Sequence, residues 1–130
     1  MIETNTTIFV VDDDVSVRKA LKRLIESVGF NVETFASAQE FLNYAPCEGP
    51  GLLVLDVRMP GMSGLELQKE LIASGSEIPI IFITAHEDPG AHTLAMEGGA
   101  IAFFQKPFDD QKLFDAIHLA LDQNTRGLPD

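Results

Sequence analysis

Four short runs that are apolar at every position constrain the fold of this chain more than any other feature. They cover residues 8–11, 52–55, 80–83 and 101–104. Continuous apolar runs of this length fit strands that helices cover on both faces, as in parallel sheets. A fifth segment, 31–35, alternates polar and apolar residues and therefore fits a half-exposed strand at a sheet edge.

A segment with the spacing of an amphipathic helix follows each predicted strand. The second and third helices are expected to begin at Ser37 and Ser63, because a glutamate three residues later completes the capping-box pattern. Gly29 ends the first helix, the fourth is expected over 89–97, and the fifth is expected to start at Asp109 or Asp110. The apolar stripes of the first and fifth helices are Val17, Leu21, Leu24, Ile25 and Val28, and Leu113, Ala116, Ile117, Ala120 and Leu121.

This alternation of strand and helix predicts five βα units in one α/β domain. The expected architecture is a doubly wound, five-stranded parallel sheet in the order 2-1-3-4-5, with a switch point between strands one and three. A length of 130 residues suits a single domain. Residues 1–123 are assigned to that domain, and residues 124–130, where the periodicity is lost, are expected to form a linker or a disordered tail.

Polar side chains stand where the apolar runs end. Asp12 and Asp13 follow the first run, Asp56 follows the run at 52–55, Thr84 follows the run at 80–83, and Lys106 lies just past the last. Ligands of open α/β sheets bind outside the carboxyl ends of the strands. These five side chains are therefore expected to form one site.

Three crowded carboxylates repel one another unless one is protonated or a cation lies among them. Hard divalent cations prefer oxygen ligands, and Mg²⁺ commonly combines one or two carboxylates with water and phosphate oxygens. Asp13 and Asp56 are the expected direct ligands and Asp12 is expected to act through water. A backbone carbonyl within 56–58 is expected to complete the set, whereas Asp14 is interpreted as a helix cap.

A carboxylate beside Mg²⁺ can act as a nucleophile toward phosphorus. Phosphoryl transfer needs positioning and neutralisation of the equatorial oxygens, which the metal and the Lys106 ammonium would supply. The Thr84 hydroxyl would add a further contact, and the small Ala85 leaves room for the group. The residues therefore predict that Asp56 accepts a phosphoryl group and holds it as a mixed anhydride.

Charge and composition exclude several other functions. A net charge of −11 makes this chain a poor partner for nucleic acid. The apolar runs are too short to span a membrane, and the first five residues lack a signal-peptide core. One cysteine, Cys47, excludes an internal disulfide, and a reducing cytoplasm is the expected location.

Four motifs at the ends of these strands resemble those of a response-regulator receiver domain of two-component signalling, which has a flavodoxin-like fold. The motifs are Val11-Asp12-Asp13-Asp14, Leu55-Asp56-Val57-Arg58-Met59-Pro60-Gly61-Met62-Ser63-Gly64, Ile83-Thr84-Ala85 and Lys106-Pro107-Phe108. Together they span nearly the whole chain. The loop after Asp56 and residues 103–108 are most similar to receivers attached to LuxR-type helix-turn-helix output domains.

The resemblance implies a role for each matching position. Asp56 would be the phosphoacceptor, and Lys106 would contact the phosphoryl group. The aromatic switch position is Phe103, and the bond before Pro107 is expected to be cis. The remaining implied roles are Mg²⁺ binding by Asp12, Asp13, Asp56 and the Arg58 carbonyl, switching by the Thr84 hydroxyl, and tuning of phosphoryl lifetime by Arg58 and His86.

The resemblance also implies partners. A sensor histidine kinase would donate the phosphoryl group, and phosphorylation would drive homodimerisation or release of a C-terminal DNA-binding output domain. The chain would then catalyse only its own phosphorylation and dephosphorylation. The alternatives are a stand-alone receiver that docks a partner and an aspartate-nucleophile phosphatase. The phosphatase needs a second acid beside the nucleophile, where this chain has Val57 and Arg58.

Overall fold

The computed structural model describes residues 6–44, 51–85 and 87–126. Five parallel strands form one sheet in the order β2-β1-β3-β4-β5, which confirms the predicted topology. The elements in chain order are β1 (Thr7–Val11), α1 (Val15–Glu26), β2 (Asn31–Phe35), α2 (Ala38–Asn43), β3 (Gly51–Asp56), α3 (Gly64–Ala73), β4 (Ile80–Thr84), α4 (Pro89–Glu97), β5 (Ala102–Gln105) and α5 (Asp110–Arg126).

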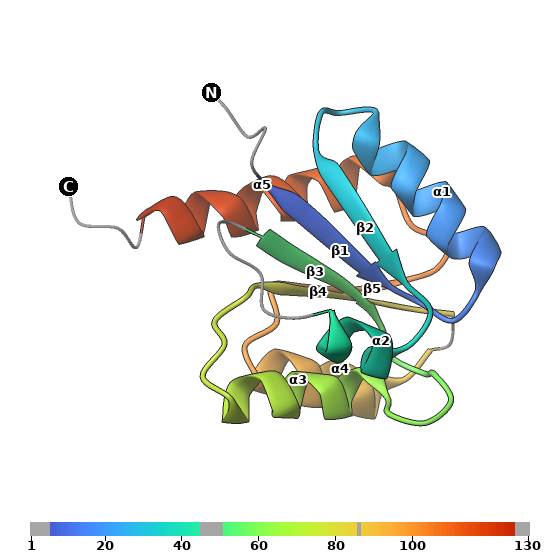
Figure 1. Ribbon diagram of the computed structural model, residues 1–130. Helices are drawn as coiled ribbons and strands as arrows, with labels where there is room; N and C mark the ends of the chain where they lie inside the picture. The colour runs from blue at the N-terminus through green and yellow to red at the C-terminus, as the bar shows by residue number, and fades with distance from the viewer. Residues whose placement is uncertain (1–5, 45–50, 86, 127–130) are drawn as a thin grey trace.

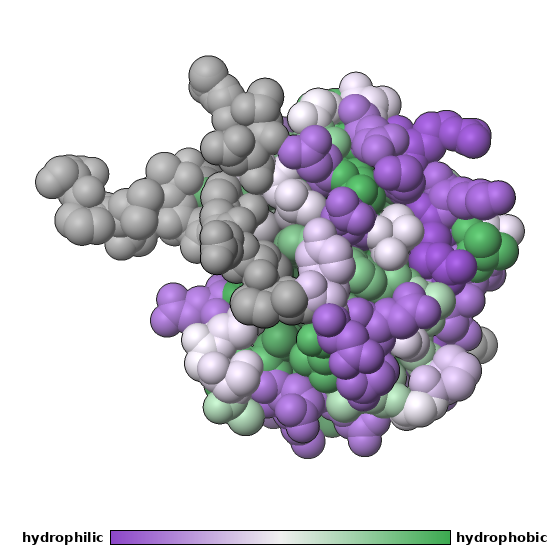
Figure 2. All heavy atoms as spheres, viewed as in Figure 1, coloured by the Kyte–Doolittle hydropathy of each residue, from purple (hydrophilic) through white to green (hydrophobic). Residues whose placement is uncertain are grey.

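Helices cover both faces of the sheet and bury two apolar layers. Helices α1 and α5 lie on one face, and α2, α3 and α4 lie on the other (Figure 1). Figure 2 shows that the outer surface over α1 is mostly hydrophilic, as expected of an amphipathic helix on a sheet.

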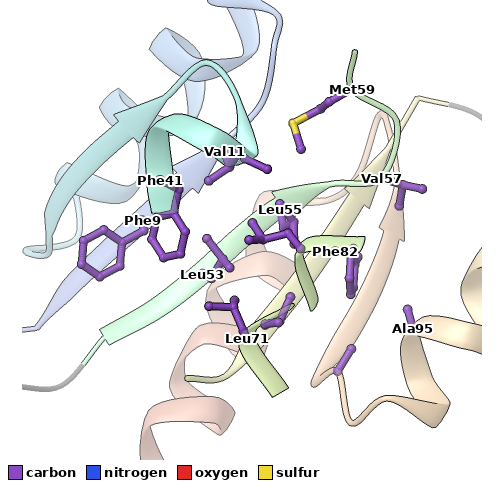
Figure 3. Packing of buried hydrophobic residues seen from close by; sticks show 14 of the residues in the cluster. Phe9, Val11, Phe41, Leu53, Leu55, Val57, Met59, Leu71, Phe82 and Ala95 are labelled. Carbon is purple, nitrogen blue, oxygen red and sulfur yellow. The ribbon is translucent and has the colours of Figure 1, made fainter. Parts of the chain in front are cut away.

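The central strands are apolar at every position because both of their faces are covered. Successive side chains of a strand point to opposite faces, so Leu52 and Val54 pack toward α1 and α5 while Leu53 and Leu55 pack toward α3 and α4. In Figure 3, Leu53 and Leu55 lie in the same layer as Phe82 of β4. Full burial of one such side chain contributes about 1.5–3 kcal/mol, and this packing holds the strand ends in register.

Strand β5 departs from the expectation that its faces are fully covered. It begins at Ala102, and its apolar residues are only partly buried, unlike those of β3 and β4. The reason is topological, because β5 is the second edge of the sheet and has a neighbouring strand on one side only.

Serine and aspartate caps begin the helices largely as the sequence predicts. Ser63 and Glu66 form a complete capping box, with both reciprocal bonds present. At Ser37 only half of the box forms, because the Glu40 carboxylate accepts from the Ala36 N–H at 2.9 Å instead. Asp14 caps α1 by accepting from the N–H of Ser16 at 2.8 Å.

Two helix ends differ from the predictions. Val28 lies beyond the end of α1 and is 44% exposed, so it does not belong to the buried stripe. Helix α5 continues to Arg126, past the predicted start of the tail at residue 124, because polar residues extend a helix without extending its apolar stripe. Cys47 lies outside the described residues. Across the described part of the chain, no helix combines the length and apolarity that crossing a bilayer requires.

Gly64 permits the close approach between the start of α3 and the end of β3. Its N–H donates to the Val57 carbonyl at 2.9 Å. A Cβ at this position would collide with the backbone carbonyl of Asp56 and lie 3.1 Å from the Leu55 side chain. Neither the strand carbonyl nor the buried leucine has room to move away, so glycine is required here.

We expect Gly64→Ala to lower the free energy of unfolding by roughly 2–3 kcal/mol, because the backbone must shift to relieve the overlap. Urea denaturation followed by circular dichroism measures this loss. Gly90→Ala is the control, since its nearest contact would be Asp88 at 3.7 Å. That change should be neutral or stabilising by up to about 1 kcal/mol. Equal effects of the two substitutions would contradict the steric argument.

Candidate functional site

Three carboxylates meet at the carboxyl ends of β1 and β3. Asp12 and Asp13 directly follow β1, and Asp56 is the last residue of β3. The pairing of Val11 with Leu55 places Asp12 level with Asp56 on neighbouring strands. One oxygen from each of the three carboxylates lies within 4.8 Å of the others. The structure therefore brings together the acidic residues that the sequence placed in one site.

Asp12 is buried and held in place by hydrogen bonds from three directions. Its Oδ1 accepts from the N–H of Asp14 at 2.8 Å, and its Oδ2 accepts from Lys106 Nζ at 3.0 Å. Its backbone carbonyl accepts from Arg18 Nη1 at 2.8 Å. Because both carboxylate oxygens are engaged, Asp12 has a fixed orientation beside Asp56.

Lys106 reaches the site from the loop after β5. Its N–H donates to the Thr84 carbonyl at 2.7 Å, and the bond between Lys106 and Pro107 is cis, as predicted. Its ammonium pairs with Asp12, although its charge also acts on Asp56. Sequence spacing placed Lys106 at the site but could not identify which carboxylate it contacts.

The surroundings of Asp56 favour its neutral form. Burial is the largest cause, and the charge of Asp12 adds to it, so that the pKa of Asp56 rises from 3.8 to about 7. The Asp13 charge acts in the same direction. Lys106 and a hydrogen bond from the Arg58 N–H act in the opposite direction and lower the pKa only in part. A single ammonium does not neutralise three carboxylates.

A hard divalent cation fits this donor set. The ligands are carboxylate oxygens, their mutual repulsion is incompletely offset, and Asp13 keeps the cluster open to water. Such a site binds Mg²⁺ through a few carboxylates and leaves positions for water and phosphate oxygens. The acidic pocket of Asp12, Asp13 and Asp56 could therefore bind Mg²⁺.

Thr84 and Phe103 lie on the face of the sheet that α3 and α4 cover. Thr84 ends β4 and is buried, and Phe82 precedes it by two residues on the same face. The Phe103 ring lies 6.0 Å from that of Phe82 and stacks on that of His92 in α4 at 4.9 Å. A displacement at Thr84 would therefore act on the layer that contains Phe103. His86 lies outside the described residues.

Two contacts of the site were not foreseen from the sequence. Arg18 binds the Asp12 carbonyl, and Arg58 pairs with Asp88 at 2.8 Å. Arg18 lies six residues after Asp12 in the sequence, and Asp88 lies 30 residues after Arg58. Charge alone did not identify the partner of Arg58, because the chain has 20 acidic residues, and it gave no signal for Arg18, whose acceptor is a backbone carbonyl.

The fold and the acidic pocket define a doubly wound α/β domain with a cluster of three carboxylates at its switch point. Residues 8–118 match the response regulator receiver domain family. The chain belongs to this family, and it is a receiver domain of the kind found in transcriptional regulators of two-component systems.

Several similar proteins are regulators of transcription or signalling. The chain is 46% identical over 123 residues to nodulation protein W of Bradyrhizobium diazoefficiens, covering 95% of this chain and 54% of that protein. It is 42% identical over 120 residues to the transcriptional regulatory protein FixJ of the same species, covering 92% of this chain and 58% of FixJ. The chain thus spans about half the length of the curated relatives that it matches.

Solved structures of similar proteins have the same fold. The response regulator StyR matches with a TM-score of 0.87 and 54% identity, covering 93% of this chain and 61% of that chain. The FixJ-N structure matches with a TM-score of 0.84 and 40% identity, covering 96% of this chain and 97% of that chain.

The raised pKa of Asp56 predicts how stability depends on pH when no divalent cation is present. In the unfolded chain this carboxyl loses its proton near pH 4, whereas the folded protein retains it to about pH 7. The folded state therefore binds more protons in that window, and its free energy of unfolding falls as the pH rises. Asp56→Asn removes this dependence and should stabilise the metal-free protein at pH 8 by on the order of 2 kcal/mol.

Urea unfolding in the presence of a chelator, repeated from pH 4 to pH 8, measures this difference. Mg²⁺ at pH 8 should then stabilise the wild type, because it binds only the folded state, and should stabilise Asp56→Asn much less. Asp115→Asn, which removes an exposed charge on α5, is the control and should respond to Mg²⁺ as the wild type does. Parallel pH profiles for wild type and Asp56→Asn would contradict the assignment.

Proposed function

We propose that this chain accepts a phosphoryl group on Asp56 from the phosphohistidine of a sensor kinase and thereby switches a transcriptional output domain. The observation that supports this most directly is the clustering of Asp56 with Asp12 and Asp13 beside the Lys106 ammonium. A buried carboxylate in such surroundings is a nucleophile whose charge must be balanced while it reacts.

The transfer is a displacement at phosphorus. A carboxylate oxygen of Asp56 attacks, the new P–O bond forms as the P–N bond to the donor imidazole breaks, and the departing imidazole takes a proton from solvent. Mg²⁺ would be held by Asp12, Asp13, Asp56 and the Arg58 carbonyl, and it would neutralise the carboxylate and phosphoryl charges. Attack of water on the same phosphorus then breaks its bond to the Asp56 oxygen, releases inorganic phosphate and restores the carboxylate, so the chain catalyses only its own phosphorylation and dephosphorylation.

Lys106 and Thr84 stabilise the phosphorylated form in this proposal. The Lys106 ammonium already lies among the carboxylates and can shift from Asp12 to a phosphoryl oxygen. Thr84 ends β4 beside Lys106, because its backbone carbonyl accepts a hydrogen bond from the Lys106 N–H. The Thr84 hydroxyl can therefore turn toward the same phosphoryl group. Arg58 and His86 are proposed to tune the rate of dephosphorylation.

Switching would begin when the Thr84 hydroxyl moves toward the phosphoryl group. The move opens space on the α4 face of the sheet, and the half-buried Phe103 ring turns inward and leaves its stacked position on His92. The surface formed by α4, β5 and α5 then changes shape. Phosphorylation shifts the population between two packings because only one of them contacts the phosphoryl oxygens.

The proposed partners follow from this switch. The phosphorylated surface would mediate homodimerisation or release a C-terminal DNA-binding domain of the LuxR helix-turn-helix type. Residues 1–123 would form the receiver and residues from 124 onward a connection to that domain. Relatives named as transcriptional regulators support this proposal, as does this chain's span of about half their length. Contact with a sensor kinase and the single cysteine of the chain suit a location in the cytoplasm.

Treatment with acetyl phosphate and Mg²⁺ tests the acceptor. Intact-mass spectrometry should show one added phosphoryl group on the wild type and none on Asp56→Asn. Because an acyl phosphate reacts with hydroxylamine, that reagent should remove the label. Labelling of the two proteins to the same extent would refute Asp56 as the acceptor.

Thr84→Val separates phosphorylation from switching, because valine has the shape of threonine without the hydroxyl. We expect this variant to be labelled on Asp56 but to lack the change at Phe103 that follows labelling in the wild type. Nuclear magnetic resonance of a ring-labelled Phe103 measures that change. A normal Phe103 response in Thr84→Val would contradict the proposed role of the hydroxyl.

A further inference from the structure

Asp88 connects the loop after β3 with the first turn of α4. One of its oxygens, Oδ2, accepts from Arg58 Nη2 at 2.8 Å, and the other, Oδ1, accepts from the Ala91 N–H at 3.0 Å. Asp88 is therefore both the N-cap of α4 and the partner of Arg58. The start of α4 is joined through one carboxylate to the loop that follows Asp56.

Besides the His92–Phe103 ring stack and the hydrogen bond from Gln68 Nε2 to the Ala95 carbonyl at 3.1 Å, helix α4 has few buried side chains to hold it against the sheet. It is nine residues long, and Ala91 and Ala95 are its only buried residues, each with a single methyl group to pack. Most of the helix surface is exposed, including Leu94 at 53%. A contact at the N-terminus therefore has a larger effect on the position of α4 than it would have on a well-buried helix.

Arg58 contacts the acceptor site with its backbone and Asp88 with its side chain. Its backbone N–H donates to the Asp56 carboxylate, whereas its guanidinium extends to Asp88. The Arg58 side chain is 59% exposed, and the pair stands in an open groove also lined by Met59 and Pro60. The guanidinium therefore has room to exchange one anionic partner for another.

We propose that Asp88 is a positioning residue that holds the Arg58 guanidinium away from Asp56, and that a phosphoryl group on Asp56 draws Arg58 from Asp88 and so frees the start of α4. This inference rests on the proposed function. It adds a second connection from the acceptor site to α4, separate from the path through Thr84 and Phe103.

The competition favours the phosphoryl group for electrostatic reasons. An exposed pair between single charges is weak, because water screens it and both side chains lose freedom. A phosphoryl group carries about −1.5 to −2 charges and several acceptor oxygens, which suit the planar guanidinium. Coupling is reciprocal, so breaking the Arg58–Asp88 pair must also change how readily the site accepts an anionic donor.

A double-mutant cycle with Asp88→Asn and Arg58→Gln tests this competition. Asparagine keeps an acceptor for the Ala91 N–H, so the helix cap is retained while the charge pair is lost. In the protein that retains Arg58, Asp88→Asn should raise the rate of phosphorylation by acetyl phosphate roughly two- to fivefold. This factor corresponds to the free energy of one exposed ion pair. In the Arg58→Gln background the same substitution should have little effect. Asp88→Ser, which also retains a cap, should repeat the result.

Hydrogen exchange at the N–H of Ala91 and His92 tests the effect on α4. In the wild type, acetyl phosphate with Mg²⁺ should speed this exchange. In Arg58→Gln the exchange should already be faster before treatment, and phosphorylation should add little to it. Thermal unfolding of each variant verifies that the fold is intact.

The outcomes separate this inference from the proposed function. If wild type gains no phosphoryl group, the proposed function fails and the inference fails with it. If wild type is phosphorylated but Asp88→Asn changes the phosphorylation rate by the same factor with and without Arg58, only the inference is overturned. Asp88 would then act through its own charge and not through Arg58. Equal acceleration of α4 exchange in wild type and Arg58→Gln would overturn it as well.

Discussion

Repulsion among the carboxylates of Asp12, Asp13 and Asp56 is the constraint on which the rest of the site depends. Their oxygens lie within 4.8 Å of one another, and Lys106 supplies the ammonium that pairs with Asp12. The incomplete balance raises the pKa of Asp56 and creates the demand for a cation. The same imbalance would make the site responsive to a phosphoryl group, since the proposed phosphorylation adds about −1.5 to −2 charges beside these residues.

The fold maintains this unfavourable cluster by placing it at the end of a well-packed sheet. Strands β1 and β3 are fully buried along most of their length, so their ends cannot separate to relieve the repulsion. Each buried apolar side chain along these strands, such as Leu53 and Phe82, contributes about 1.5–3 kcal/mol, and together they hold the strand ends in place. Helix α4 and strand β5 are less buried than these central strands, and they are the parts proposed to move.

Most of the fold followed from local patterns in the sequence. Apolar runs located the strands to within about one residue, and Ser63 with Glu66 marked the start of α3. The predictions were wrong where neighbours in space decide the outcome. Val28 matched the helical spacing yet is exposed, and β5 was expected to be covered on both faces yet is partly exposed. Spacing reports which residues share a face but not how much of that face is covered.

The sequence by itself determined the order of the strands, the edge at which the polar side chains gather and the identity of the three carboxylates, because strand period and parallel topology follow from local pattern. The tertiary structure alone decided which partner each charge has. Lys106 pairs with Asp12, and Arg58 pairs with Asp88 across 30 residues of chain. A side chain with several anionic neighbours within reach selects among them by distance and angle, and those are set only when all the elements are packed together.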